Sequence, residues 1–212
     1  GFLGVLIFSG SLPATRIAVE GFDPAFLTLA RASIAGVLAL AILCIFRQKA
    51  PAKSDLVSLS IVSLGVVIGF PLLTALELRE ITSAHSIVFI GLLPLATAIF
   101  AVLRGGERPR PAFWFFSCLG SILVAGFALL KDMAGSMVGD GLMVCAVIVC
   151  GLGYAEGAAL SRRLGGWQVI SWALVLSLPV MLPLAVFLAP QSFSDITGAA
   201  WGGLFYVSLF SM

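Results

Sequence analysis

Long apolar runs separated by short polar turns make up almost the whole chain. The runs cover about residues 2–19, 25–46, 56–78, 81–103, 112–130, 141–160, 168–189 and 199–212. A helix needs about 20 mostly apolar residues to cross a bilayer, whereas a membrane β-strand needs about ten of alternating polarity. The runs are long and do not alternate, so they predict eight membrane-spanning helices, the last of them incomplete. The expected fold class is all-α, a polytopic transmembrane helical bundle.

The composition excludes most classes of soluble protein. Of the 212 residues, 60% are hydrophobic and only 10% are charged, against about 25% charged residues in an average soluble domain. So few charges cannot cover a soluble fold, which excludes an ordinary soluble enzyme, a nucleic-acid-binding protein and a disordered chain. The cysteines lie inside apolar runs and match no metal-binding spacing: Cys44, Cys118, Cys145 and Cys150. We therefore expect buried thiols, no disulfide, no metal and no other cofactor.

The charged residues of the turns divide by sign. Basic residues gather after the second, fourth and sixth runs: Arg47, Lys49, Lys53, Arg104, Arg108, Arg110, Arg162 and Arg163. The other turns are mostly acidic: Glu20, Asp23, Glu80, Asp132, Asp140 and Asp195, with Arg79 and Lys131. Cytoplasmic turns of membrane proteins are enriched in Lys and Arg. The pattern therefore predicts that turns 47–55, 104–111 and 161–166 lie in the cytoplasm.

A weak internal similarity relates the first run to the sixth. Residues 6–26 and 148–168 both contain an apolar helix interrupted by Gly and Ser, then a charged end, a short turn and a new helix. A repeat of this length holds five helices, and an odd number inverts the second unit in the membrane. We expect a first unit over 1–130 and a partial second unit over 139–212. Inverted repeats are typical of secondary transporters.

Several motifs resemble the EamA family of the drug/metabolite transporter superfamily. The stretch LLPLATA at 92–98, Glu107, Gly120 and Gly126 resembles the fourth and fifth helices of its repeat. Residues 24–31 resemble its second helix, and residues 139–164 resemble the opening of its second repeat. The resemblance implies ten helices, about eight of them in this chain, in a multi-pass transporter of the bacterial cytoplasmic (inner) membrane. Because the chain starts at Gly1 and stops inside an apolar run, we expect truncation at both ends.

Charged groups inside a span cost about 2.5–3.5 kcal/mol on insertion scales, so each needs a reason. They are Arg16, Arg31, Glu77, His85 and Glu156. Arg16 and Glu77 lie near the outer ends of their spans, where they either snorkel to the interface or form an outer vestibule. Arg31 lies deeper, which favours a structural role in holding the second helix against a neighbour, with backbone carbonyls or Glu77 as partner.

Two of these groups are candidates for proton coupling. His85 is the only histidine, and it either packs as a hydrogen-bonded side chain or titrates, since imidazole changes charge near neutral pH. Glu156 either pairs with Arg162 and Arg163 one turn further on, or faces the substrate path and takes part in protonation. Both alternatives stay open for both residues.

Helix-breaking residues indicate where a cavity opens. Pro13, Pro71 and Pro94 lie inside apolar runs, and a broken helix is tolerated at membrane depth only where protein or water satisfies the freed carbonyls. Polar side chains near these breaks are the predicted substrate path: Ser11, Thr74, Tyr154 and Glu156. Their alternative role is bonding to a neighbouring helix.

Pairs of glycines one helical turn apart predict close helix packing. They are Gly65 with Gly69, and Gly153 with Gly157. Small residues at this spacing let two helices approach closely. We expect packing within the bundle, with a homodimer face as the alternative.

The function favoured is a secondary transporter for a small molecule, with the lipid bilayer as its environment and no nucleic-acid partner. The resemblance implies amino acids or related amphiphilic metabolites as cargo and export as the direction. A nucleotide-sugar or phosphorylated-sugar carrier of the same superfamily is the alternative, as is a non-transporting channel or scaffold. An enzyme is disfavoured, since one histidine cannot form His-Glu-x-x-His and no Gly-x-Ser-x-Gly occurs.

Overall fold

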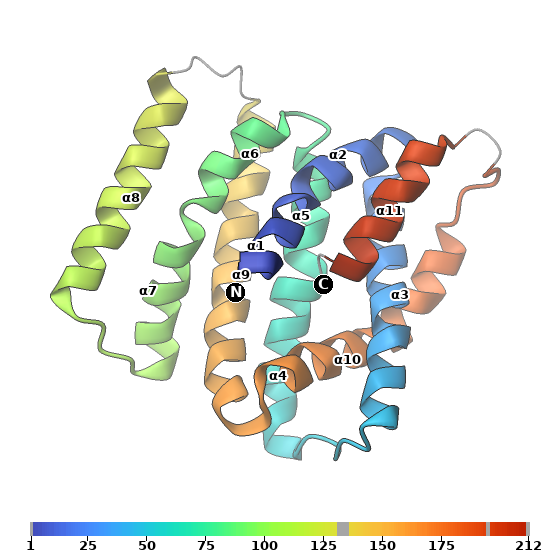
Figure 1. Ribbon diagram of the computed structural model, residues 1–212, viewed down its shortest axis with the longest axis horizontal. Coiled ribbons are helices and arrows are strands. Elements are labelled where there is room, and N and C mark those ends of the chain that lie inside the picture. The colour runs from blue at the N-terminus through green and yellow to red at the C-terminus, as the bar shows by residue number, and fades with distance from the viewer. Residues whose placement is uncertain (1, 131–135, 194–195, 211–212) are drawn as a thin grey trace.

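The computed structural model describes residues 2–130, 136–193 and 196–210, and these ranges form a helical bundle without strands (Figure 1). The elements are α1 (Phe2–Ser9), α2 (Ser11–Gly21), α3 (Pro24–Ile45), the 3₁₀ turn η1 (Lys53–Asp55), α4 (Leu56–Val62), the π-helix η2 (Ser63–Gly69), α5 (Phe70–Glu77), α6 (Ser83–Ile90), α7 (Leu93–Gly105), α8 (Pro111–Leu130), α9 (Met137–Leu164), α10 (Gly166–Phe187) and α11 (Gly198–Phe210). The all-α prediction is confirmed.

Three of the predicted spans are interrupted helices. The spans Phe2–Gly21, Lys53–Glu77 and His85–Arg104 are each assembled from consecutive shorter elements. Together with Pro24–Ile45, Met137–Leu164 and Gly166–Phe187 they are long and apolar enough to cross a membrane, and Pro111–Val124 and Gly198–Phe210 are shorter apolar helices. Within the described ranges the chain therefore has the eight apolar helical segments that the hydropathy pattern predicts.

Local chemistry at the turns explains where the helices begin and end. Asp23 caps α3 by accepting hydrogen bonds from the backbone amides of Ala25 and Phe26, and Pro24 fits the first helical position, where no amide donor is needed. Gly106 follows the end of α7 and Gly165 follows the end of α9. These two glycines have positive φ values of 61° and 93°. Glycine adopts this left-handed backbone without steric cost and so terminates the preceding helix.

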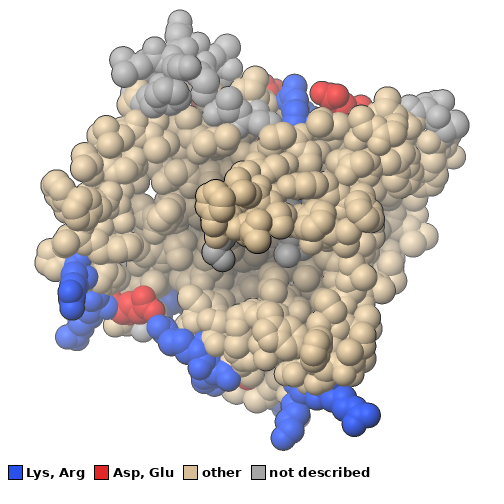
Figure 2. All heavy atoms as spheres, viewed as in Figure 1, with Lys and Arg blue, Asp and Glu red and all other residues tan. Residues whose placement is uncertain are grey.

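The bundle separates its charges into two ends. Figure 2 shows Lys and Arg side chains along one edge of the molecule, and the basic turns 47–55, 104–111 and 161–166 make up this basic end. The acidic end carries the turns between α2 and α3 and between α5 and α6, and the first turn of α9. Lys131, Asp132 and Asp195 lie outside the described residues. Three independent turns thus share one side, as the orientation argument requires.

The orientation can be tested by cysteine labelling. We expect a single cysteine placed at Lys53 or Arg108, in a background without the native cysteines, to react with an impermeant maleimide only after the cells are permeabilised. A cysteine at Glu20 should react in intact cells. Labelling of the basic end in intact cells would reverse the orientation and remove the main support for an inverted repeat.

Close packing joins the helices in pairs. The most extensive contacts are α3 with α10, α7 with α9 and α2 with α11, whereas α8 lies at the edge of the bundle, mainly against α6 and α7 (Figure 1). Gly65 of η2 lies against Gly153 of α9, where an added Cβ would stand 3.2 Å from the Gly153 Cα. These glycines therefore serve packing within the bundle, and they offer no support for the homodimer alternative.

One expectation about burial is wrong. Cys150 is buried, but Cys44, Cys118 and Cys145 are exposed on the outside of the bundle. The reason is that an apolar position in a membrane helix can face lipid as well as the protein core. The many exposed large apolar side chains of the bundle, such as Leu103 and Ile122, follow from the same cause.

Candidate functional site

A cavity of about 280 Å³ lies among the interrupted spans, and we call it the central cavity. Its described lining comes from α1 and α2, α3, the η2–α5 segment, α6 and α9: Phe8, Ser9, Ser11, Leu12, Thr15, Arg31, Val66, Phe70, Pro71, Thr74, Ile87, Ile90 and Tyr154. Most of these side chains are apolar. The polar ones therefore determine what the cavity can bind and in which orientation.

Each of the sequence-predicted helix breaks marks the start of a new helical segment. Pro13 follows the junction at Gly10 between α1 and α2, Pro71 is the second residue of α5, and Pro94 is the second residue of α7. A π-helix directly precedes α5, and such segments widen a helix and leave backbone groups outside the regular ladder. Pro71 lines the central cavity, whereas Pro94 lines a second cleft described below.

The structure brings three of the predicted path residues together. Ser11, Thr74 and Tyr154 all line the central cavity. The Oγ atom of Ser11 and the Oγ1 atom of Thr74 are buried and have no hydrogen-bond partner in the described part of the chain. By contrast, Thr15 on the same wall donates to the carbonyl oxygen of Ser11 at 2.7 Å. Buried hydroxyls without a partner call for a ligand or water.

Glu156 is placed elsewhere than predicted. Its Oε1 accepts from the Nε of Arg104 at 2.6 Å, on the side of α9 that packs against α7. Residues two apart on a helix point about 200° apart, so Tyr154 and Glu156 cannot both face one cavity. The alternative partners on the next turn, Arg162 and Arg163, also differ from the observed one.

A second cleft of about 830 Å³ runs between α7 and α9 toward the basic end. Glu107, Arg108 and Arg162 lie on its wall near the charged turns. Ile90 and Tyr154 line both this cleft and the central cavity. These two side chains therefore lie between the central cavity and the second cleft.

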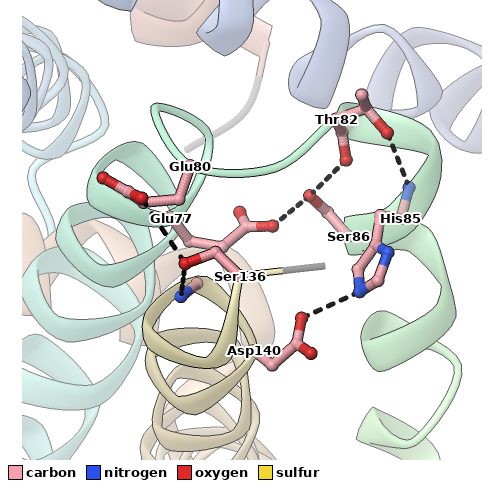
Figure 3. Close-up of polar contacts among 8 residues, drawn as sticks. Glu77, Glu80, Thr82, His85, Ser86, Ser136 and Asp140 are labelled. Atoms are coloured by element: carbon pink, nitrogen blue, oxygen red, sulfur yellow. Dashed lines mark hydrogen bonds and ion pairs between the residues drawn. The ribbon is translucent and has the colours of Figure 1, made fainter. Parts of the chain in front are cut away.

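Polar contacts at the acidic end hold α6 against its neighbours (Figure 3). The Nε2 of His85 lies 2.8 Å from the Oδ1 of Asp140 in the first turn of α9. Ser86 donates a hydrogen bond to the carboxylate of Glu77, whose side chain is fully buried at the end of α5. Both contacts begin on the first turn of α6, which thus bridges two helices that are distant in sequence.

Arg16 supports the same end from α2. Its Nη1 donates to the carbonyl oxygens of Leu78 and Ile81, the latter at 3.0 Å. These carbonyls follow the last turn of α5, where helical partners are missing and a cation is favourable. Arg16 does not line the central cavity in the described structure, so its position fits a support of the α5–α6 turn.

The comparisons with known proteins agree on one family. Residues 1–130 match the EamA-like transporter family. The chain belongs to this family. It is 70% identical over 212 residues to the uncharacterized transporter YdeK of Bacillus subtilis, covering all of this chain and 74% of that protein.

More distant relatives and a solved structure extend the match. The chain is 23% identical over 209 residues to the uncharacterized inner membrane transporter YedA of Escherichia coli, covering 94% of this chain and 67% of that protein. A transporter of Archaeoglobus fulgidus is 25% identical over 213 residues, with coverages of 98% and 73%. A solved crystal structure superposes with a TM-score of 0.64 at 19% identity, covering 98% of this chain and 72% of that chain.

Family membership confirms several predictions. The EamA-like chain is a multi-pass membrane transporter and not an enzyme, and its substrate is a small molecule. Within the described ranges, no three His, Cys, Asp or Glu side chains gather in a way that could hold a metal ion.

Sequence reasoning missed the partners of the charged residues. Ion pairs at the basic end join α9 to segments that lie far away in sequence: Arg104 with Glu156, Arg162 with Glu107 at 2.7 Å, and Arg163 with Asp55 at 2.6 Å. Asp55 is buried although it lies in a predicted loop. The sequence did contain one signal for such a pair. Asp55 stands at the start of one apolar run, and Arg162 and Arg163 stand at the end of another.

Proposed function

We propose that this chain belongs to a secondary transporter that exports small amphiphilic metabolites of the size of amino acids. The observation that carries the proposal is the central cavity, in which broken helices surround unpaired hydroxyls with apolar walls. Its volume of about 280 Å³ is near the lower limit of small-molecule sites. In this proposal Ser11, Thr74 and Tyr154 contact the substrate.

The cavity also bears on the alternatives. A nucleotide sugar is far larger than an amino acid and carries several negative charges, whereas the described lining has a single cationic side chain, Arg31. No phosphate-binding Gly-rich loop occurs in the sequence, so the energy source in this proposal is an ion gradient or the substrate gradient. Inverted units over 1–130 and 139–212 would provide the two-state rocking that such carriers use.

Substitution of the cavity hydroxyls tests the proposal. In the full-length protein reconstituted in proteoliposomes, we expect Thr74→Val and Tyr154→Phe each to raise the KM for a transported amino acid about threefold to tenfold, the usual effect of one hydrogen bond. The yield of folded protein should stay near that of the wild type. Counterflow of a radiolabelled amino-acid panel provides the measurement.

Thr28 supplies the matched control. Its hydroxyl is buried and also lacks a partner in the described structure, but it lies outside the cavity lining. Thr28→Val should leave the KM unchanged. If all three variants reduce folded protein alike and leave the KM of the remainder unchanged, the hydroxyls serve packing and the cavity is not the substrate site.

A further inference from the structure

We propose that the central cavity selects substrates that carry a carboxylate, and that Arg31 is the residue that binds this group. The inference rests on the proposed function and narrows its substrate class to small monocarboxylates with an apolar side chain. It gives Arg31 a role in recognition beyond the structural one that its depth in the span predicts.

The position of Arg31 separates it from a snorkelling residue. It lies seven residues into α3, which places its Cα about 10 Å along the helix from the acidic end. Arg31 is 5% exposed, and it forms part of the wall of the central cavity. A guanidinium held this deep in a membrane protein is costly unless it serves a partner or a ligand.

The charge balance of the cavity favours an anion. Arg31 is the charged residue among the described lining side chains, and no carboxylate appears among them. Glu77 and Glu156, the acidic residues of the neighbouring spans, bind Ser86 and Arg104 respectively and lie outside the lining. Opposite charges attract one another more strongly in the low-dielectric interior of a protein than in bulk water, so a cationic side chain in the cavity wall favours one negative charge.

The geometry of the guanidinium favours a carboxylate. Its planar fork carries five N–H donors and matches the two oxygens of a carboxylate. Arg31 also has an interaction within the protein, and five donors are enough to keep that interaction and bind a ligand as well. Bidentate pairs of this kind add orientation to affinity.

Two further groups complete a polar patch. Ser11 and Thr74 are 7% and 4% exposed, and their hydroxyl oxygens lack partners in the described part of the protein. Both belong to the same cavity wall as Arg31, on α2 and α5. They can donate to a bound carboxylate or accept from an adjacent amino group.

The apolar residues of the lining determine which group the substrate carries beside its carboxylate. Leu12, Val66, Phe70, Ile87 and Ile90 provide an apolar surface within the same cavity. A molecule with one carboxylate and one aliphatic or aromatic side chain satisfies both parts. A phosphate ester carries about two charges and would need a second cation, but the other arginine of the neighbourhood, Arg16, is bound to backbone carbonyls.

Matched pairs of probes test the inference. Proteoliposomes that contain the full-length protein are loaded with leucine, phenylalanine or valine, and competition is compared between each amino acid and its carboxamide. We expect the wild type to prefer at least one carboxylate probe over its amide by about tenfold or more. Arg31→Gln should reduce this preference to about one, and Arg31→Lys should retain part of it.

A control variant, and measurement on folded protein only, distinguish an effect on substrate recognition from an effect on folding. Arg16→Gln removes a half-buried guanidinium outside the cavity and should leave the preference ratio unchanged. The ratio is measured on the folded fraction, isolated by size-exclusion chromatography, so a loss of yield alone does not affect it. A wild-type ratio near one, or an unchanged ratio in Arg31→Gln, overturns the inference.

The outcomes also distinguish this inference from the proposed function. Equal transport of amino acids and amides would leave a small-metabolite carrier without carboxylate selection. If folded wild-type protein moves no probe of either kind, the proposed function is wrong and the carboxylate site falls with it.

Discussion

Replacing Gly65 with leucine is expected to abolish folding of the protein in the membrane. At this position η2 crosses α9 so closely that even a methyl group would lie 2.5 Å from the carbonyl oxygen of Val149 and 3.3 Å from the backbone nitrogen of Gly153. The atoms in the way belong to the backbone, so no side chain can rotate aside. Gly65→Ala should already cost about 1–3 kcal/mol, and the leucine variant more.

Total stability makes this cost decisive. A folded domain is stable by only about 5–15 kcal/mol, and α9 packs against α4, η2, α5, α7 and α10. Forcing η2 away from α9 therefore disturbs most of the bundle at once. The measurement is the yield of monodisperse protein in mild detergent and its Tm, compared with the wild type.

Gly157→Ala is the matched control on α9. An added Cβ there meets only a methyl group of Val62 at 3.5 Å, which is ordinary contact. It should leave yield and Tm near those of the wild type. A normal yield of Gly65→Leu would mean that the two helices are further apart than the structure places them.

The sequence was sufficient to predict the bundle because bilayer thickness fixes the length of each apolar run. Helix starts were also readable where capping chemistry is local, as at Asp23 and Pro24. The π-helix Ser63–Gly69 was not, since its widening depends on how η2 meets α9. Only the proline that follows it gave a sign of irregular backbone.

The candidate site was readable only in part for a related reason. Ser11 and Thr74, which lie near helix breaks, line one cavity, and such breaks are tolerated where a cavity or protein replaces lipid. The rotation of α9 about its axis determines which neighbouring helix Glu156 faces. An apolar run without strong periodicity does not reveal this rotation. Partners such as His85 and Asp140 are 55 residues apart, so only the order of helices in the bundle brings them together.

Two contacts of α6 predict an outer gate. α6 is a separate segment, since Gly91 and Leu92 interrupt the span before α7. Ile87 of α6 lines the central cavity, and the residues directly before it, His85 and Ser86, hold the helix to Asp140 and Glu77 (Figure 3). Releasing both contacts should let the first turn of α6 move and expose the cavity from the acidic end.

The expected effect is large because each contact involves a buried polar group. The side chain of His85 is 9% exposed and that of its partner Asp140 is 39% exposed. Hydrogen bonds to charged groups contribute about 1.5–3 kcal/mol, and a partly exposed pair lies at the lower end of this range. Loss of that much stabilisation from the closed state raises the open population about tenfold or more. Asp140→Ala and Ser86→Ala should each show such an increase, and the double variant about a hundredfold.

Labelling from outside intact cells measures the gate. The reporter is Thr15→Cys, on the wall of the central cavity, in a background without the native cysteines, treated with an impermeant thiosulfonate reagent. Arg79→Ala is the control, because it breaks only the exposed pair with Asp23 at 3.6 Å and exposed pairs contribute little. Faster labelling in the Asp140 and Ser86 variants but not in the control identifies α6 as the gate. If the folded double variant, with both Asp140→Ala and Ser86→Ala, is labelled no faster than the wild type, α6 stays closed without these contacts and is held by its apolar packing alone.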